Sequence, residues 1–185
     1  MSKGKLFVIS GASGVGKSTV LAQVMSRRED LRFSVSATTR PPRPTEVEGK
    51  DYYFVSHDDF RQMIRQDQFL EYDEHMGNFY GTPVGQLEDK LTSFHVVLDV
   101  EPVGAFNVRA KRPDAVLIFV APPSREILEQ RLRGRGDTDE EQIRLRLARA
   151  DWEMEQSTQY DYVVINDQVD ACADRILHII ADKAD

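Results

Sequence analysis

Residues 5–18 read KLFVISGASGVGKS, a run that joins a short apolar strand to a helix through a glycine-rich turn. Residues 11–18 fit the pattern G-x-x-x-x-G-K-[ST] in the strand-to-helix context that this phosphate-binding motif requires. The glycines let backbone N–H groups turn toward the phosphates of a nucleoside triphosphate. Lys17 adds a cation, and Ser18 offers a hydroxyl to Mg²⁺. A glycine-rich turn without a ligand needs neither of these two residues, so the run predicts nucleotide binding.

The remainder of the chain alternates segments of strand and helix character, which is typical of a parallel sheet covered by helices. We expect strands at residues 5–10, 33–37, 94–99, 116–121 and 162–165. We expect helices over residues 17–28, from 102, from 124, over 138–156 and over 171–181. Pro102 suits the first turn of a helix. Ser124 with Ile127, and Thr138 with Glu141, have the spacing of helix N-caps.

Residues 36–87 interrupt this alternation. They hold a proline-rich turn, a strand-like segment, a helix and a glycine-punctuated segment, at residues 40–44, 52–55, 58–66 and 77–82. Ser56 and Asp59 have capping-box spacing for that helix. We interpret residues 36–87 as a mostly β subdomain inserted into a single domain that covers residues 1–185.

The bulk composition is that of a globular protein, with 185 residues, 41% hydrophobic and 30% charged. The one cysteine, Cys172, excludes an internal disulfide, and no signal peptide or apolar span of about 20 residues is visible. We therefore expect a cytoplasmic protein. The net charge of −7 argues against nucleic acid or an anionic membrane as partner. Phosphate binding would need clustered cations, and residues 125–149 hold seven arginines.

A series of motifs follows the phosphate loop. Residues 36–44 read SATTRPPRP, residues 49–54 read GKDYYF, and Glu71 precedes the run GNFYGT at residues 77–82. Further matches are Asp99, residues 122–124, Arg131 with Leu132, Arg135 with Gly136, and Asn166 with Asp167. The series resembles the guanylate kinase family over nearly the whole chain. The resemblance implies a P-loop NTPase three-layer fold with a central parallel sheet, an inserted mostly β GMP-binding subdomain and a short helical lid at about residues 125–149.

The chemistry of the acceptor residues supports the same interpretation. Arg40 and Arg43 stand three apart on a proline-stiffened turn and suit a phosphate dianion. The Glu71 carboxylate can accept from the N1–H and the 2-amino group of guanine, a donor pair that adenine lacks. A solvated basic turn and an ordinary exposed glutamate are the alternatives. By resemblance, GMP binds Ser36, Arg40, Arg43, Tyr52, Glu71, Tyr80, Thr82, Asp99 and Glu101.

The resemblance also implies the donor site and the catalytic groups. ATP is expected at Gly11, Ala12, Ser13, Gly14, Val15, Gly16, Lys17, Ser18, Thr19, Arg135 and Asn166, with Mg²⁺ at Ser18 and Asp99. The expected catalytic residues are Lys17, Arg40, Arg131, Arg135 and Arg146. Salt bridging of the arginines to Glu129, Glu140 and Glu141 on a solvated surface is the alternative, and Arg149 is the arginine to which it applies best.

The implied activity is Mg²⁺-dependent transfer of the γ-phosphoryl group of ATP to GMP, giving ADP and GDP, in purine nucleotide metabolism. The implied partners are the small-molecule substrates ATP and GMP, with no nucleic acid and no membrane. The acidic composition and the single cysteine permit either a monomer or a homodimer. Two alternatives remain: a catalytically inactive protein-binding module, which the intact loop disfavours, and an enzyme with another nucleotide or a phosphorylated sugar as acceptor. The chain departs from the family at Glu101, usually Asp, at Val103, often Gln, and at Pro102 and Thr45.

Overall fold

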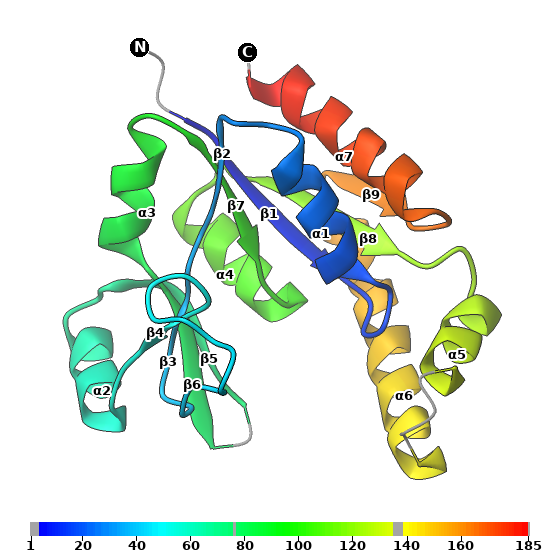
Figure 1. Cartoon of the computed structure of the whole chain (residues 1–185), viewed down its shortest axis with the longest axis horizontal. Coiled ribbons are helices and arrows are strands. Elements are labelled where there is room, and N and C mark those ends of the chain that lie inside the picture. The colour runs from blue at the N-terminus through cyan, green and yellow to red at the C-terminus, as the bar shows by residue number, and fades with distance from the viewer. Residues whose placement is uncertain (1–3, 76, 135–138, 185) are drawn as a thin grey trace.

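The chain folds into two β-sheets with helices packed around them in a computed structural model, which describes residues 4–75, 77–134 and 139–184 (Figure 1). The larger sheet has five parallel strands in the order β2-β7-β1-β8-β9. Its strands are β1 (Leu6–Gly11), β2 (Leu31–Phe33), β7 (His95–Asp99), β8 (Val116–Ala121) and β9 (Tyr162–Ile165). The three central strands are nearly continuous apolar runs that are buried on both faces, as a covered parallel sheet requires.

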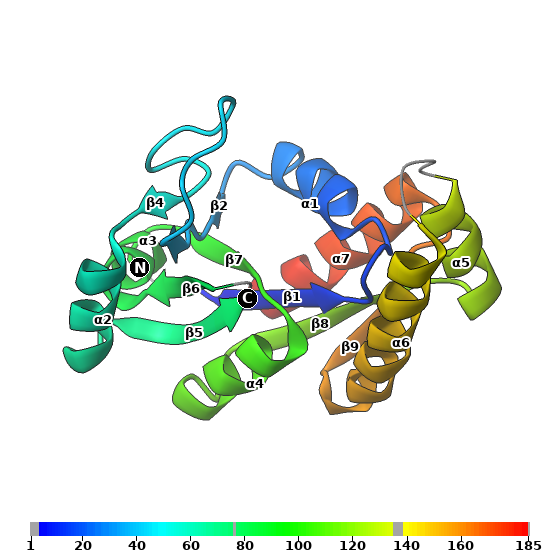
Figure 2. The same cartoon turned by 90° about the horizontal axis from the view of Figure 1, so that it is seen from below.

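Helices cover both faces of this sheet and complete the expected three layers. Figure 2 shows α1 (Lys17–Ser26) and α7 (Val169–Ala184) on one face, and α4 (Pro102–Lys111) and α6 (Glu140–Gln156) on the other. A short α5 (Arg125–Arg133) packs against α6, and α3 (Val84–Leu91) packs against β7. A 3₁₀ turn, η1 (Ser157–Gln159), connects α6 to β9.

The smaller sheet lies within residues 37–83 and has the order β4-β3-β6-β5. It is built from β3 (Ala37–Thr38), β4 (Tyr53–Phe54), β5 (Phe69–His75) and β6 (Asn78–Pro83), with α2 (His57–Arg65) beside it. Three aromatic rings form its own small core: Phe60 stacks on Phe69 and on Phe79, with ring centroids 4.3 and 5.3 Å apart. This sheet therefore has a core separate from the main one.

Several predicted helix starts are confirmed. The Ser56 side chain accepts from the Asp59 N–H at the start of α2, the Ser124 side chain accepts from the Ile127 N–H at the start of α5, and Pro102 is the first residue of α4. The predicted N-cap at Thr138 is wrong, because the Asp139 side chain accepts from the Gln142 N–H and caps α6 instead. Threonine and aspartate side chains both accept the capping hydrogen bond at a helix N-terminus. Because Thr138 and Asp139 are adjacent, residue type alone does not decide which of them caps the helix.

The predicted strand at residues 33–37 is also wrong. β2 ends at Phe33 in the larger sheet, and Ala37 begins β3 in the smaller one. The Ser34 N–H still donates to the Val97 carbonyl, 2.8 Å away, before the chain crosses between the sheets. Local composition fits an extended segment throughout, and only the pairing partners separate the two strands.

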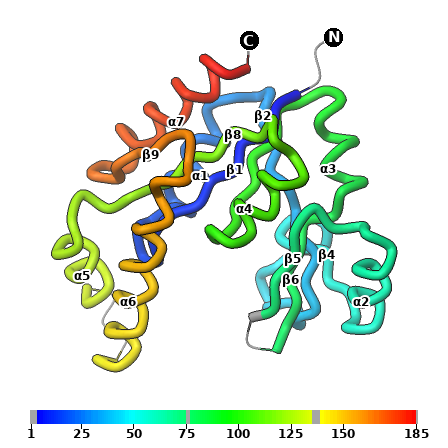
Figure 3. Tube along the Cα trace, turned by 180° about the vertical axis from the view of Figure 1, so that it is seen from behind, coloured from blue at the N-terminus to red at the C-terminus, as the bar shows by residue number. Residues whose placement is uncertain are grey.

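The two sheets and the α5–α6 pair frame the carboxyl ends of the central strands. The smaller sheet lies on one side of these ends and α5 with α6 on the other, as the views from front and back agree (Figures 1 and 3). Ligands of parallel α/β sheets bind at this edge. Within the described ranges, no helix combines the length and apolar character needed to cross a membrane.

Candidate active site

The phosphate loop joins β1 to α1 and takes a conformation that requires glycine. Gly14 and Gly16 have φ angles of 84° and 91°, in the left-handed region that residues with a Cβ rarely adopt. A Cβ at Gly16 would also come within 3.1 Å of the Asn166 amide nitrogen. The loop therefore has the turned backbone that the sequence motif predicts.

Lys17 begins α1 and lies largely buried at the end of the loop. Its ammonium group forms an ion pair with the carboxylate of Asp99, at the carboxyl end of β7. Burial lowers the pKa of Lys17 to about 8, against the opposing effect of the Glu101 and Glu153 carboxylates. The nearby carboxylates thus favour the protonated, cationic form of Lys17.

The residues expected to hold Mg²⁺ have suitable chemistry. Ser18 and Thr19 are exposed in the first turn of α1, and Asp99 lies beside Lys17. Hydroxyl and carboxylate oxygens are hard donors that fit Mg²⁺, which is usually bound by one or two protein groups together with substrate phosphates. Within the described residues no group of three or more His, Cys, Asp or Glu side chains could hold a metal by itself. The donor set therefore fits a metal that is bound together with a nucleotide.

A cavity of about 320 Å³ lies between the phosphate loop and the smaller sheet. Seven predicted site residues line it, although they come from distant parts of the chain: Lys17, Ser36, Tyr52, Glu71, Tyr80, Asp99 and Glu101. Asp73, Gly81, Val100 and Gly104 also line it. Sequence reasoning named none of these four as a site residue, although Gly81 lies in the run GNFYGT at residues 77–82. Asp73 stands two residues from Glu71 on one strand and so shares its face.

Glu71 lies on β5 with only 7% of its surface exposed. One carboxylate oxygen accepts a 2.6 Å hydrogen bond from the Thr82 hydroxyl on β6. Burial raises the pKa of Glu71 against the effect of this bond. The other oxygen lies close to α4, where a Cβ at Gly104 would approach it to 3.0 Å. Gly104 thus keeps the space beside the carboxylate clear, and a glycine inside a predicted helix was the signal for it.

The predicted phosphate-binding turn contains an unexpected acidic partner. Arg40 Nη2 donates to a Glu46 oxygen at 2.8 Å, and the Arg43 backbone N–H donates to the other oxygen at 2.7 Å. The Arg40 hydrogen bond lowers the pKa of Glu46. Arg40 also lies 5.5 Å from the centre of the Tyr52 ring, which meets Tyr80 edge-to-face.

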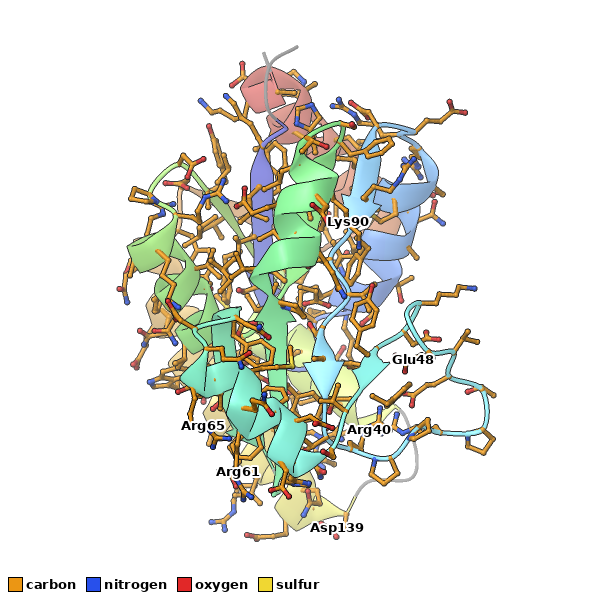
Figure 4. All side chains as sticks on the ribbon, turned by 90° about the vertical axis from the view of Figure 1, so that its left-hand side faces the viewer. Arg40, Glu48, Arg61, Arg65, Lys90 and Asp139 are labelled. Atoms are coloured by element: carbon orange, nitrogen blue, oxygen red, sulfur yellow. The ribbon has the colours of Figure 1, made fainter. Side chains whose placement is uncertain are left out.

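Arg40 therefore lies between the Glu46 carboxylate and the pair of tyrosine rings, whereas Arg43 is exposed on the turn and binds Glu46 through its backbone N–H. Figure 4 shows Arg40 at the start of the loop that leads to Glu48. Sequence reasoning missed Glu46. Its signal was an acidic residue three positions after Arg43 and six after Arg40.

The arginines of residues 125–149 divide into two groups. Arg125, Arg133, Arg144 and Arg149 form ion pairs with carboxylates. Glu129, Glu140 and Glu141 pair with Arg125, Arg133 and Arg144. Arg149, to which the salt-bridging alternative applied best, pairs with Glu101 and Glu153 instead of these three acids. Arg146 has no ion pair with any residue within the described ranges. Arg135 lies outside the described residues.

Arg131 contacts the phosphate loop directly. Its guanidinium donates to the Val15 carbonyl at 3.3 Å and to the Asn166 carbonyl at 2.9 Å. Asn166 is buried beneath the loop, where its side-chain amide donates to the same Val15 carbonyl at 2.8 Å. Arg131, predicted as catalytic, and Asn166, predicted to bind ATP, therefore both stabilise the loop through the Val15 carbonyl.

Glu101 lies at the mouth of the cavity, exposed, as the N-cap of α4. Its carboxylate forms an ion pair with Arg149 of α6. The departure from the family at this position thus coincides with a contact between α6 and the carboxyl end of β7.

Comparison with known proteins places these features in a family. The model of the guanylate kinase family matches residues 3–183. The chain is 48% identical to a guanylate kinase of Trichodesmium erythraeum, over 92% of both chains. It is 47% identical to one of Thermus thermophilus, over 98% of this chain and 83% of the relative. A crystal structure of guanylate kinase from Anaplasma phagocytophilum superposes with a TM-score of 0.78 and 35% identity, over 99% of this chain and 87% of that one.

Proposed function

Since the chain belongs to the guanylate kinase family and is thereby an ATP:GMP phosphotransferase, we propose that it carries out a Mg²⁺-dependent transfer at the cavity between the phosphate loop and the smaller sheet. The observation that carries this proposal is the lining of that cavity. Lys17 and Asp99 of the donor side line the same cavity as Glu71, Tyr52 and Tyr80. A donor phosphate at Lys17 and an acceptor held by the smaller sheet would then meet in one space.

We assign the acceptor phosphate to Arg40, Arg43, Tyr52 and Tyr80. Guanidinium and phenolic groups donate to a phosphate dianion, and Arg40 already binds an anionic group, the Glu46 carboxylate. The guanine base would meet Glu71, whose carboxylate accepts from N1–H and the 2-amino group. Ser36, Thr82, Asp99 and Glu101 complete the proposed GMP site. Adenine would leave the buried carboxylate without donors, a mismatch that costs roughly 10⁴-fold in selectivity.

The chemical step needs no general base. An oxygen of the GMP phosphate, anionic at neutral pH, attacks the γ-phosphorus, and the bond to the oxygen bridging the β- and γ-phosphorus atoms breaks to release ADP. Catalysis then rests on in-line positioning and on neutralising the charge of the transferring group. Lys17, Arg131, Arg135 and Arg146 would supply cations there. Mg²⁺, held through Ser18 and Asp99, would neutralise charge on the ATP phosphates.

Closure would complete the site. We propose that residues 36–87 form the GMP-binding subdomain and residues 125–149 a lid, both moving toward the phosphate loop when both nucleotides are bound. Exclusion of water would prevent hydrolysis of ATP in place of transfer. Asn166 and the loop from Gly11 to Thr19 would hold ATP. The reaction would belong to purine nucleotide metabolism in the cytoplasm, carried out by a monomer or a homodimer.

The test uses ATP labelled on its γ-phosphate, with GMP, AMP, CMP or UMP as acceptor, with Mg²⁺ and with EDTA. Labelled GDP formed with GMP and Mg²⁺, and background with every other combination, is the expected result. Equal labelling of AMP would favour a different acceptor. Labelling of no acceptor would point to a binding module, and transfer in EDTA would refute the metal dependence.

A further inference from the structure

A buried carboxylate beside the phosphate loop has no part in the reaction as proposed. Glu153 lies in the last turns of α6 with 3% of its surface exposed. Glutamates are seldom buried to this extent without partners that stabilise the charge. Its contacts therefore indicate what the residue does.

Both partners of Glu153 are hydrogen-bond donors. One carboxylate oxygen accepts from the backbone N–H of Ser13, in the phosphate loop, at 2.6 Å. The other accepts from Nε of Arg149, one turn earlier in α6, at 3.1 Å. The site therefore needs two acceptor oxygens at once, which a carboxylate provides and an amide does not.

Arg149 continues the chain of contacts to a second part of the site. Its guanidinium forms an ion pair with Glu101, at the carboxyl end of the strand that carries Asp99. Through Glu153 and Arg149, α6 is thus attached both to the phosphate loop and to the wall of the cavity.

The same helix face carries Arg146. Arg146, Arg149 and Glu153 are spaced by three and four residues, so they line up along α6. Ile143, Leu147 and Ala150 are buried in the core. Arg146 stands about 10 Å along the axis from Glu153, and it forms no ion pair within the described ranges. Attachment at Glu153 therefore fixes where Arg146 lies relative to the phosphate loop.

We propose that Glu153 is a positioning residue, which ties α6 to the Ser13 N–H and so aims Arg146 at the transferring phosphoryl group. The part of this inference that concerns Arg146 rests on the proposed function. The tie between Glu153 and the nucleotide-binding loop does not, because it concerns the loop's own geometry.

The main variant is Glu153→Gln, with Glu155→Gln as its matched control. Glutamine has nearly the same shape but one acceptor oxygen, so its NH₂ group would face one of the two donors. We expect kcat to fall roughly ten-fold, because a buried donor loses its acceptor and α6 is no longer held in place relative to the phosphate loop. Glu155 is exposed on the same helix, and its replacement should leave kcat and both KM values unchanged.

Two further variants separate positioning from other roles. Glu153→Asp keeps the charge near Lys17 but is one methylene too short to reach both donors, so it should lose activity as well. A kcat preserved in Glu153→Asp but lost in Glu153→Gln would overturn the proposal in favour of a purely electrostatic role. Should Glu153→Gln fail to fold, Arg149→Gln removes the second donor to the Glu153 carboxylate and the ion pair with Glu101, at a side chain that is 40% exposed. The bond between Glu153 and the Ser13 N–H stays, so a smaller loss of kcat is expected.

Circular dichroism establishes the folded fraction, so that kcat is compared per folded molecule. Folded Glu153→Gln and Glu153→Asp enzymes with the kcat and ATP KM of Glu155→Gln would overturn the proposal. If the unsubstituted chain itself forms no GDP, the proposed function has failed and equilibrium binding of ADP decides the inference instead. Weaker ADP binding by Glu153→Gln than by Glu155→Gln supports the tie to the loop, and equal binding refutes it.

Discussion

The phosphate loop and the smaller sheet hold their polar groups in different ways. The loop is a contiguous run whose backbone is fixed by two left-handed glycines and supported from below by Arg131 and Asn166. The smaller sheet gathers single side chains from separate strands and loops, and these bind one another: Glu71 with Thr82, and Arg40 with Glu46.

This difference indicates how each side receives its ligand. The loop offers a formed backbone and needs little rearrangement to accept a phosphate. Polar groups of the smaller sheet are already hydrogen-bonded to one another. An acceptor must therefore break some of these bonds and form its own with the freed groups. Substitutions on the loop should therefore act on every acceptor alike, whereas those on the sheet should act on acceptor binding and choice.

Lys17→Ala should have the largest effect. It removes the buried cation beside Asp99, and we expect kcat to fall at least ~10²-fold, whichever acceptor is offered. A coupled assay of ADP release measures it, with Lys183→Ala on the last helix as control. Near-normal turnover would remove Lys17 from the catalytic groups.

Arg40→Ala should come next and should act on the acceptor side. We expect kcat/KM for GMP to fall roughly 10²-fold while KM for ATP stays within about two-fold, because the guanidinium holds the acceptor phosphate. Arg61→Ala, on the exposed face of α2, is the control. An equal rise of both KM values would contradict the separation of the two sides.

Arg146→Ala and Arg144→Ala form a matched pair on α6. Arg144 is paired with Glu141, whereas Arg146 has no such pair within the described ranges. Loss of a cation that acts on the transferring group should lower kcat roughly ten-fold for Arg146→Ala. Arg144→Ala should leave it unchanged, and steady-state rates at saturating ATP and GMP distinguish the two. Equal rates would place Arg146 among the solvated arginines.

The smallest expected effect is a pH dependence from Glu71. Only the ionised carboxylate accepts from both guanine donors, and burial raises its pKa, so protonation begins at a higher pH than in an ordinary glutamate. As pH falls, kcat/KM for GMP should decline, by about two-fold where half of Glu71 is protonated. Glu71→Gln keeps the titration of GMP itself and serves as the reference profile. Identical profiles would show that Glu71 does not titrate in acceptor binding.

The sequence predicted the larger sheet and its loop well, because their signals are local. The strand at residues 116–121 and the cap at Ser124 follow from runs of a few residues. The crossing between sheets after Phe33 could not be predicted in this way, since it depends on which distant strands pair.

The cavity residues divide in the same way, into those that local motifs predict and those that depend on contacts between distant segments. Its named acceptor residues came from motifs, and the structure brings most of them together. The motifs do not include Glu46, although it lies only six residues after the arginine that it binds. They gave no hint that Glu153 binds the loop across 140 residues of sequence, a contact that is decided by tertiary packing.

The most direct test of the claim that the smaller sheet chooses the acceptor is a selectivity ratio, kcat/KM for GMP divided by kcat/KM for AMP. It is measured in the unsubstituted chain, in Lys17→Ala and in Glu71→Gln. The ratio should stay constant in Lys17→Ala, although both rates fall, and should drop by roughly 10²-fold or more in Glu71→Gln. A Glu71→Gln enzyme that keeps the full preference for GMP would contradict the account, because guanine would then be recognised elsewhere.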